Sequence, residues 1–207
     1  NNAVSSDTVV EPPKGLRWTC GPAYARSHEH FSSMSAMVTA GGRIFYIIDE
    51  GPISSVYLPP QWKLVARDAF SGVILWKCPM PDMGWPQWKP VMADTDWAKL
   101  VAQRRLIPIT LPRRVVSDGD RVFAPLSYHA PLTIMDAATG NTLTTVEGTK
   151  GTDEILLHDN KLILTVRPHS RGSLDRKEDA LAVINRNDRL VTNHPGIVMA
   201  VNPDSGE

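Results

Sequence analysis

The densest cluster of titratable side chains in the sequence is the run from Arg26 to His30. If this run is an extended strand, His28 and His30 point to the same side and could share a metal ion, while Glu29 points away. The spacing differs from the i, i+4 His pair of a helical metalloprotease, and the sequence identifies no third ligand. His28 and His30 are therefore metal candidates without a completed ligand set.

Two pairs of ring-bearing residues could bind a ligand by stacking. Trp85 and Trp88 lie on a loop that Pro86 stiffens, where they could stack on a sugar or another planar group. They could also cover a neighbouring sheet, and we favour that structural role. Tyr128 and His129 lie in a short loop and could line the mouth of a site, with a structural histidine as the alternative.

Several kinds of chemistry have no counterpart in the sequence. It contains no Gly-x-Ser-x-Gly elbow, no phosphate-binding glycine loop and no Cys-x-x-Cys pair. The acidic pairs Asp49-Glu50 and Asp153-Glu154 have no placed partner, and we interpret them as solvated loop ends. We therefore predict no catalytic residue.

Charge and hydropathy exclude two classes of partner. The 22 Lys and Arg residues balance the 22 Asp and Glu residues, so no net field attracts nucleic acid or an anionic surface. No apolar run approaches the roughly 18 residues that span a bilayer. We expect neither a nucleic-acid partner nor a membrane span.

The compartment stays open at this point. The first residues lack a basic and an apolar region, so no secretory signal is visible, although one could have been removed. Cys20 and Cys78 could pair, but two cysteines make no disulfide framework, and we expect two unpaired thiols. The 17 prolines and 14 glycines favour many turns over long helices.

Two segment types recur along the chain. The first is a tight turn followed by a cation and a β-rich run, at 40–46, 118–123 and 159–164. Gly, Asp and Asn accept the positive φ that such turns need, and the Ile, Val, Leu and Phe residues suit buried strands. The cation after each turn is expected to lie along the strand edge with its charged head in water; these cations are Arg43, Arg121 and Lys161.

The second segment type is an Asp or Asn followed four residues later by Gly, with Ser or Thr directly before the Gly as a turn-supporting residue. Its copies begin at Asp68, Asp136 and Asn202, and their glycines are Gly72, Gly140 and Gly206. An Asx-type turn followed by a left-handed glycine is typical of a short hairpin. Because the two segment types alternate, the pattern predicts repeated antiparallel sheets.

The segment from Asp68 through Gly72 to Trp76 resembles the D-x-x-[ST]-G-x-x-x-W signature of pyrroloquinoline-quinone-like β-propeller repeats. The resemblance covers most of residues 38–207 in three imperfect copies. Thr144-Thr145 stands where the second copy would carry its Trp, and the third copy stops short of that position. The resemblance implies blades of four antiparallel strands, with the Trp packed between blades.

The resemblance sets the expected organisation. Residues 1–37 form an N-terminal segment leading into the first blade, and residues 38–207 form a partial propeller of about three blades. We expect an all-β fold with one short helix, which Asp94 or Asp96 caps and Trp97, Leu100 and Val101 line. Three insertions interrupt the repeat pattern, near 50–61, 79–105 and 167–195.

In an up-and-down blade, loops between the second and third strands share a face with the connections between blades. All three insertions fall into these two classes, and insertions in repeat proteins often gather on the binding face. We therefore predict a ligand face at this end of the blades. Its candidate residues are Glu50, Tyr57, Trp85, Trp88, Tyr128, His129, His169 and Arg171.

These observations predict a non-catalytic binding or scaffold segment of a larger protein, acting through the ligand face. The expected partners are the remaining blades of that protein or a second copy, with a protein or glycan as ligand. Two alternatives stay open: part of a calcium-dependent oxidoreductase that uses pyrroloquinoline quinone, and a carbohydrate-binding propeller.

The quinone alternative lacks its usual residues. The best-known quinoprotein dehydrogenases carry adjacent cysteines over the cofactor, whereas Cys20 and Cys78 are far apart in the sequence, and no calcium ligand set can be assigned. We predict no cofactor. Similarity to quinone-binding-like propeller proteins of environmental bacteria implies a periplasmic or extracellular location.

Overall fold

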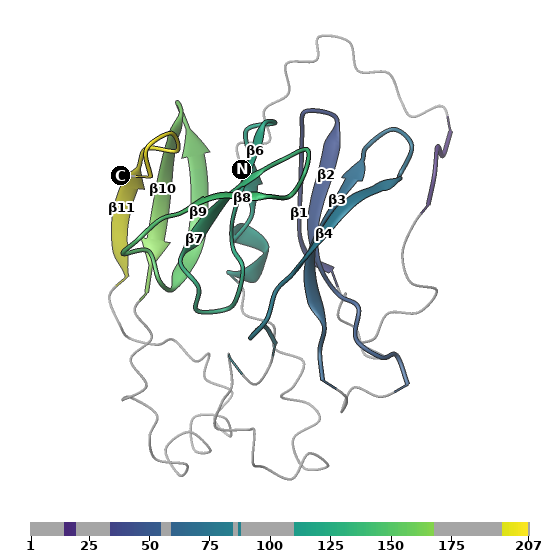
Figure 1. Cartoon of the computed structure of the whole chain (residues 1–207), viewed down its shortest axis with the longest axis horizontal. Coiled ribbons are helices and arrows are strands. Elements are labelled where there is room, and N and C mark those ends of the chain that lie inside the picture. The colour runs from purple at the N-terminus through teal and green to yellow at the C-terminus, as the bar shows by residue number, and fades with distance from the viewer. Residues whose placement is uncertain are drawn as a thin grey trace.

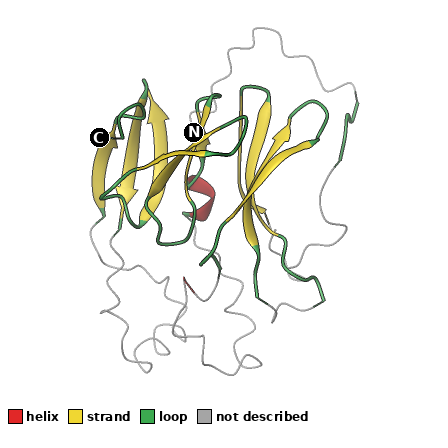
Figure 2. Cartoon of the chain, viewed as in Figure 1, coloured by secondary structure: helices red, strands yellow, loops and turns green. Residues whose placement is uncertain are grey.

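The computed structural model describes residues 15–19, 34–54, 59–84, 87, 110–167 and 196–206. These residues form three antiparallel sheets, which confirms the predicted all-β fold class (Figures 1 and 2). The one helical element among them is a single 3-10 turn, η4 (Leu111–Arg113), just before the first strand of the middle sheet. The helix predicted around Asp94–Arg105 lies outside the described residues.

Each sheet is a meander in which every strand pairs with the next one along the chain. Sheet 1 contains β1 (Met34–Ala40), β2 (Arg43–Asp49), β3 (Trp62–Asp68) and β4 (Ile74–Pro79). Sheet 2 contains β5 (Val116–Ser117), β6 (Arg121–Pro125), β7 (Leu132–Asp136) and β8 (Thr142–Thr145). Sheet 3 contains, among the described residues, β9 (Thr152–His158), β10 (Lys161–Val166) and β11 (Ile197–Val201).

The sheets pack face to face because their strands alternate. Val122 of sheet 2 packs with Phe45 of sheet 1, whereas the next residue, Phe123, packs with Leu162 and Leu164 of sheet 3. Successive side chains of a strand point to opposite faces, so both faces of sheet 2 are buried. The core is therefore two sheet-on-sheet interfaces, one on each side of sheet 2.

The first strands of the three sheets lie together. β1 is beside β5, β5 is beside β9, and η4 contacts both β1 and β9. The later strands of each sheet lie farther from this line of first strands (Figure 1).

The two ends of the sheets differ in the lengths of their connections. The turn end, at the top of Figure 1, carries the tight turns at 41–42, 69–73, 118–120, 137–141, 159–160 and 202–206. The loop end carries the connections 50–61, 80–115, 126–131, 146–151 and 167–196. The three predicted insertions therefore all lie between strands that meet the loop end.

Among the described residues, no helix is long and apolar enough to cross a membrane.

Candidate functional site

The repeat turns at the turn end form as the sequence predicts. Asp68 Oδ1 accepts hydrogen bonds from the backbone N–H groups of Phe70 and Ser71, at 3.0 and 2.6 Å, and from Ser71 Oγ at 2.8 Å. Asp136 Oδ1 likewise accepts hydrogen bonds from the backbone N–H groups of Ala138 and Thr139 and from Thr139 Oγ1. These hydrogen bonds, led by those from Ser71 and Thr139, hold the pKa of both carboxyls below its usual range.

The repeat Trp joins neighbouring sheets. Trp76 on β4 lies against Gly140 in the β7–β8 turn, where an added Cβ would come within 2.6 Å of its ring. Its Nε1 donates to the carbonyl of Ala137 at 3.0 Å. Gly140 has φ +75°, which a side chain rarely adopts, and the indole occupies the space where one would lie.

Trp18, in the segment 15–19, makes the same kind of contact with the β3–β4 turn of sheet 1, and the sequence interpretation missed it. It lies against Gly72, where an added Cβ would again be 2.6 Å from the ring, and its Nε1 donates to Ala69 at 3.0 Å. The order Trp-x-Cys, shared by Trp18 and Trp76, is the signal that could have identified it. Thr144 occupies the Trp position in the second copy, and its Cγ2 lies 4.0 Å from a Cβ added at Gly206.

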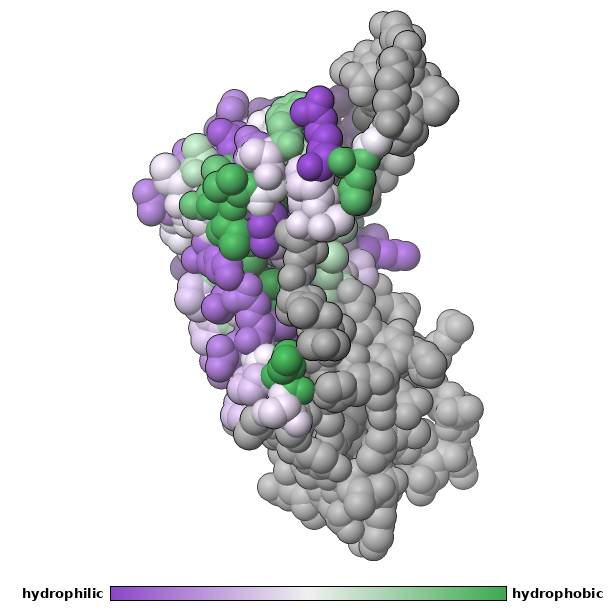
Figure 3. Space-filling view, turned by 90° about the vertical axis from the view of Figure 1, so that its right-hand side faces the viewer, coloured by the Kyte–Doolittle hydropathy of each residue, from purple (hydrophilic) through white to green (hydrophobic). Residues whose placement is uncertain are grey.

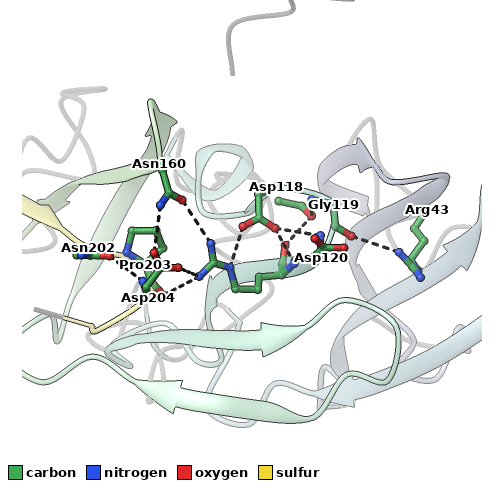
Figure 4. A network of polar contacts seen from close by, with 10 residues as sticks. Arg43, Asp118, Gly119, Asp120, Asn160, Asn202, Pro203 and Asp204 are labelled. Atoms are coloured by element: carbon green, nitrogen blue, oxygen red, sulfur yellow. Dashed lines mark hydrogen bonds and ion pairs between the residues drawn. The ribbon is translucent and has the colours of Figure 1, made fainter.

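Two of the three cations that follow the turns, Arg43 and Arg121, contact the next sheet, whereas we expected their charged heads to lie in water. Arg43 Nη1 donates to Gly119 in sheet 2 at 3.2 Å. Arg121 Nη1 donates to Pro203 at 2.9 Å and pairs with Asp204 of the same sheet 3 turn at 2.7 Å, as part of the network in Figure 4. Each cation therefore ties its own sheet to the next one along the chain.

A buried arginine lies at the loop end. Arg114, just before β5, is 2% exposed, and its Nε donates to the carbonyl of Thr152 on β9 at 2.8 Å. Its Nη2 donates to the same carbonyl and, at 2.6 Å, to the carbonyl of Tyr128 in the β6–β7 loop. The guanidinium also stacks over the Tyr128 ring at 5.2 Å. One side chain thus fixes two backbone segments from sheets 2 and 3.

The environment of Arg114 disfavours a charge. Burial lowers the pKa of its guanidinium, although Tyr128 and Asp153 oppose that shift. Burial likewise raises the pKa of the Tyr128 hydroxyl to about 12. Among the described residues, the buried Arg114 Nη1 atom has no hydrogen-bond partner.

The acidic pairs of the sequence are not the solvated loop ends that we expected. Asp153 is buried, accepts a hydrogen bond from Thr110 Oγ1 at 2.6 Å and pairs with Arg167 Nε at 3.3 Å. Glu154 pairs with Arg113 at 3.1 Å. These contacts join the segment before β5 to the first strand of sheet 3.

Glu50 also forms ion pairs. Its carboxylate pairs with Lys63 Nζ at 2.8 Å and with Lys77 Nζ at 2.6 Å. Burial opposes ionisation of Glu50, but the lysine hydrogen bonds outweigh it, so its pKa lies below the usual range. The sequence could not show this because β3 and β4 bring the two lysines to the end of β2.

Three residues of the predicted ligand face are described, and all three lie at the loop end. Tyr128 and His129 contact each other edge to face, with ring centroids 4.7 Å apart, next to Arg114. Glu50 lies in sheet 1 with its two lysines. The other candidates lie outside the described residues, as do the metal candidates; they are Tyr57, Trp85, Trp88, His169, Arg171, His28 and His30.

The described residues bring together no group of three His, Cys, Asp or Glu side chains that could hold a metal ion. Cys78 is a free, half-buried thiol, and burial raises its pKa. Cys20 lies outside the described residues.

Comparison with known proteins returned no match, either to a protein-family model or to a curated protein.

Proposed function

We propose that this protein is a non-catalytic binding or scaffold module built of propeller-type blades, which presents its loop end to a ligand. One observation carries the proposal: short turns and inter-sheet hydrogen bonds close one end of the sheets, whereas long connections lie at the other end. The turn end is closed by short Asx turns and by arginines that join adjacent sheets. The loop end combines long connections with a fixed base around Arg114.

A fixed base beneath long loops suits recognition. Arg114 holds the backbone of the Tyr128 loop and of β9 at once, so the aromatic pair Tyr128 and His129 is presented by a rigid support. Binding costs less conformational entropy when the contacting groups are already positioned. The loops can differ in sequence while this support stays the same.

The chemistry at this end supports binding of a polar ligand. Tyr128 and His129 provide an aromatic surface with polar atoms, and the buried Arg114 fixes the loop that carries them. The Tyr128 hydroxyl stays neutral at ordinary pH because its pKa is about 12. Such groups bind by stacking and hydrogen bonding.

The experiment compares the two ends with matched variants. A panel of neutral and acidic polysaccharides and of di- and tricarboxylates is screened by thermal shift against the wild type, and binders are titrated calorimetrically. Tyr128→Phe combined with His129→Ala is the loop-end variant, because Phe keeps the ring over Arg114. Phe70→Ala is the control, since Phe70 is 65% exposed in a turn-end loop.

We expect the loop-end variant to lose at least about tenfold in affinity, which is the size of one good hydrogen-bonded contact, and the control to bind like the wild type. A ligand whose affinity falls in the Phe70 variant and not in the loop-end variant contradicts the proposal.

A further inference from the structure

The face of sheet 3 that points away from sheet 2 is apolar and exposed. Strand alternation places Leu156, Ile163, Val198 and Ala200 on it, and the register aligns Leu156, Ile163 and Ala200 across the three strands. The exposed fractions are 41% for Leu156, 36% for Ile163 and 71% for Val198.

The repeat shows what kind of surface this is. Ile163 stands two residues after the cation of its turn, the position of Phe45 in sheet 1 and Phe123 in sheet 2, which are both fully buried against the following sheet. The face of sheet 3 therefore has the pattern of a sheet-on-sheet interface.

A second repeat position also has the pattern of a sheet-on-sheet interface. Val198 stands four residues before the Asx position of its turn, as do Leu64 in sheet 1 and Leu132 in sheet 2. Those two leucines are fully buried against the following sheet, whereas Val198 is 71% exposed. Lys161 extends the comparison, because the equivalent Arg43 and Arg121 each bond the following sheet and Lys161 is exposed.

We propose that a second copy of this chain covers this face with its own sheet 3. In both established interfaces the covering element is a sheet of the same repeat, which a second copy supplies. Both faces of sheet 2 are already buried, and on the far face of sheet 1 Tyr46 and Val65 are 7% and 0% exposed. Viewed from the side of sheet 1, the described residues form a mixed surface of hydrophilic and hydrophobic side chains (Figure 3). Sheet 3 thus meets sheet 3, in a twofold dimer.

Charge favours the twofold arrangement. Glu154 lies on this face toward the loop end, and Lys161 lies on it at the turn end. Two sheets that face each other across a twofold axis lying in the interface and perpendicular to the strands run their strands in opposite directions, so Glu154 of one copy comes toward Lys161 of the other. The apolar residues meet at the centre, between these two pairs of opposite charges.

The test measures the mass of the whole chain in solution by sedimentation velocity and light scattering over a range of concentrations. We expect a concentration-dependent dimer for the wild type. Ile163→Lys with Val198→Lys should weaken dimerisation at least about tenfold, because each copy would bury two unpaired charges in the interface. Leu143→Lys is the matched control, since Leu143 is 57% exposed on β8 of sheet 2. It should dimerise like the wild type.

A charge exchange keeps the test decisive if the double lysine variant folds poorly by circular dichroism. Glu154→Lys should weaken the dimer, and adding Lys161→Glu should restore it. A monomer at every concentration overturns the proposal. So does a dimer that neither the lysine substitutions nor the charge exchange affects.

Discussion

The indole ring of Trp76 fills the space where Gly140 would carry a side chain, although the two residues belong to different sheets. Trp18 and Gly72 repeat this relationship one sheet earlier. Trp76 thereby joins the outer strand of sheet 1 to a turn of sheet 2, and Trp18 joins the segment 15–19 to a turn of sheet 1; in both, a hydrogen bond from the indole Nε1 completes the contact. The glycine in the repeat is therefore required by the neighbouring sheet as well as by its own turn.

Gly140→Ala should destabilise the fold more than Gly148→Ala, and the two form a matched pair. Both glycines have φ near +75°, so each alanine carries the same backbone penalty of about 1 kcal/mol. Nothing lies within 4 Å of a Cβ at Gly148, whereas at Gly140 the Trp76 ring must move. We expect an additional loss of about 1–3 kcal/mol for Gly140→Ala. Equal urea midpoints for the two variants would contradict the contact.

Thr144→Trp should stabilise the protein, because it restores the repeat residue facing Gly206. Thr144 is exposed, and a Cβ at Gly206 would meet only Val146 and Thr144 at 3.8 and 4.0 Å. A docked indole should add about 1 kcal/mol, measured by urea denaturation. Thr145→Trp, which points to the other face of β8, is the control and should give no gain. A gain of the same size in both variants would show that the repeat position is not responsible.

Arg114→Met should destabilise the protein by about 2–4 kcal/mol, because two buried carbonyls lose their donor. Arg113→Met is the neighbouring control: Arg113 makes an ion pair with its side chain 61% exposed, so its loss should cost less than about 1 kcal/mol. Denaturant unfolding of both variants gives the comparison. Similar losses in the two would mean that Arg114 does not hold the loop end together.

How far the sequence alone predicts the molecule depends on the range of each interaction. The Asp68 and Asp136 turns were predictable because their hydrogen bonds reach only three residues along the chain. Arg114 was not, because the carbonyls that it binds lie 14 and 38 residues away and converge only when sheets 2 and 3 pack.

The acidic residues show the same limit. We expected Glu50 and Asp153 to be solvated loop ends. Strand pairing brings two lysines to Glu50, and the segment before β5 brings Thr110 to Asp153. The end of the sheets at which the candidate residues lie was easier to predict, because strand order alone fixes the end of the sheet to which each connection belongs. Glu50, Tyr128 and His129 accordingly lie at the loop end, as predicted.

Acid should destabilise the wild type more steeply than the Glu50→Gln variant. The folded pKa of Glu50 lies below its unfolded value of about 4.3, so its pairing stabilises the fold above that pH. The contribution is lost as the pH falls through the folded pKa. Urea midpoints between about pH 6 and pH 3 should therefore converge for the two proteins toward low pH. The exposed Glu147→Gln is the control and should follow the wild type; a constant gap for Glu50→Gln would contradict the pairing.

The central claim, a binding module that needs no quinone cofactor, is tested most directly by titrating the whole chain with pyrroloquinoline quinone in the presence and absence of calcium. Tryptophan fluorescence is the readout, since Trp18 and Trp76 both pack against turns of the sheets. We predict only the linear, calcium-independent loss of signal that an absorbing solute causes. Saturable quenching that requires calcium would contradict the claim and would assign the chain to the cofactor-binding part of an oxidoreductase.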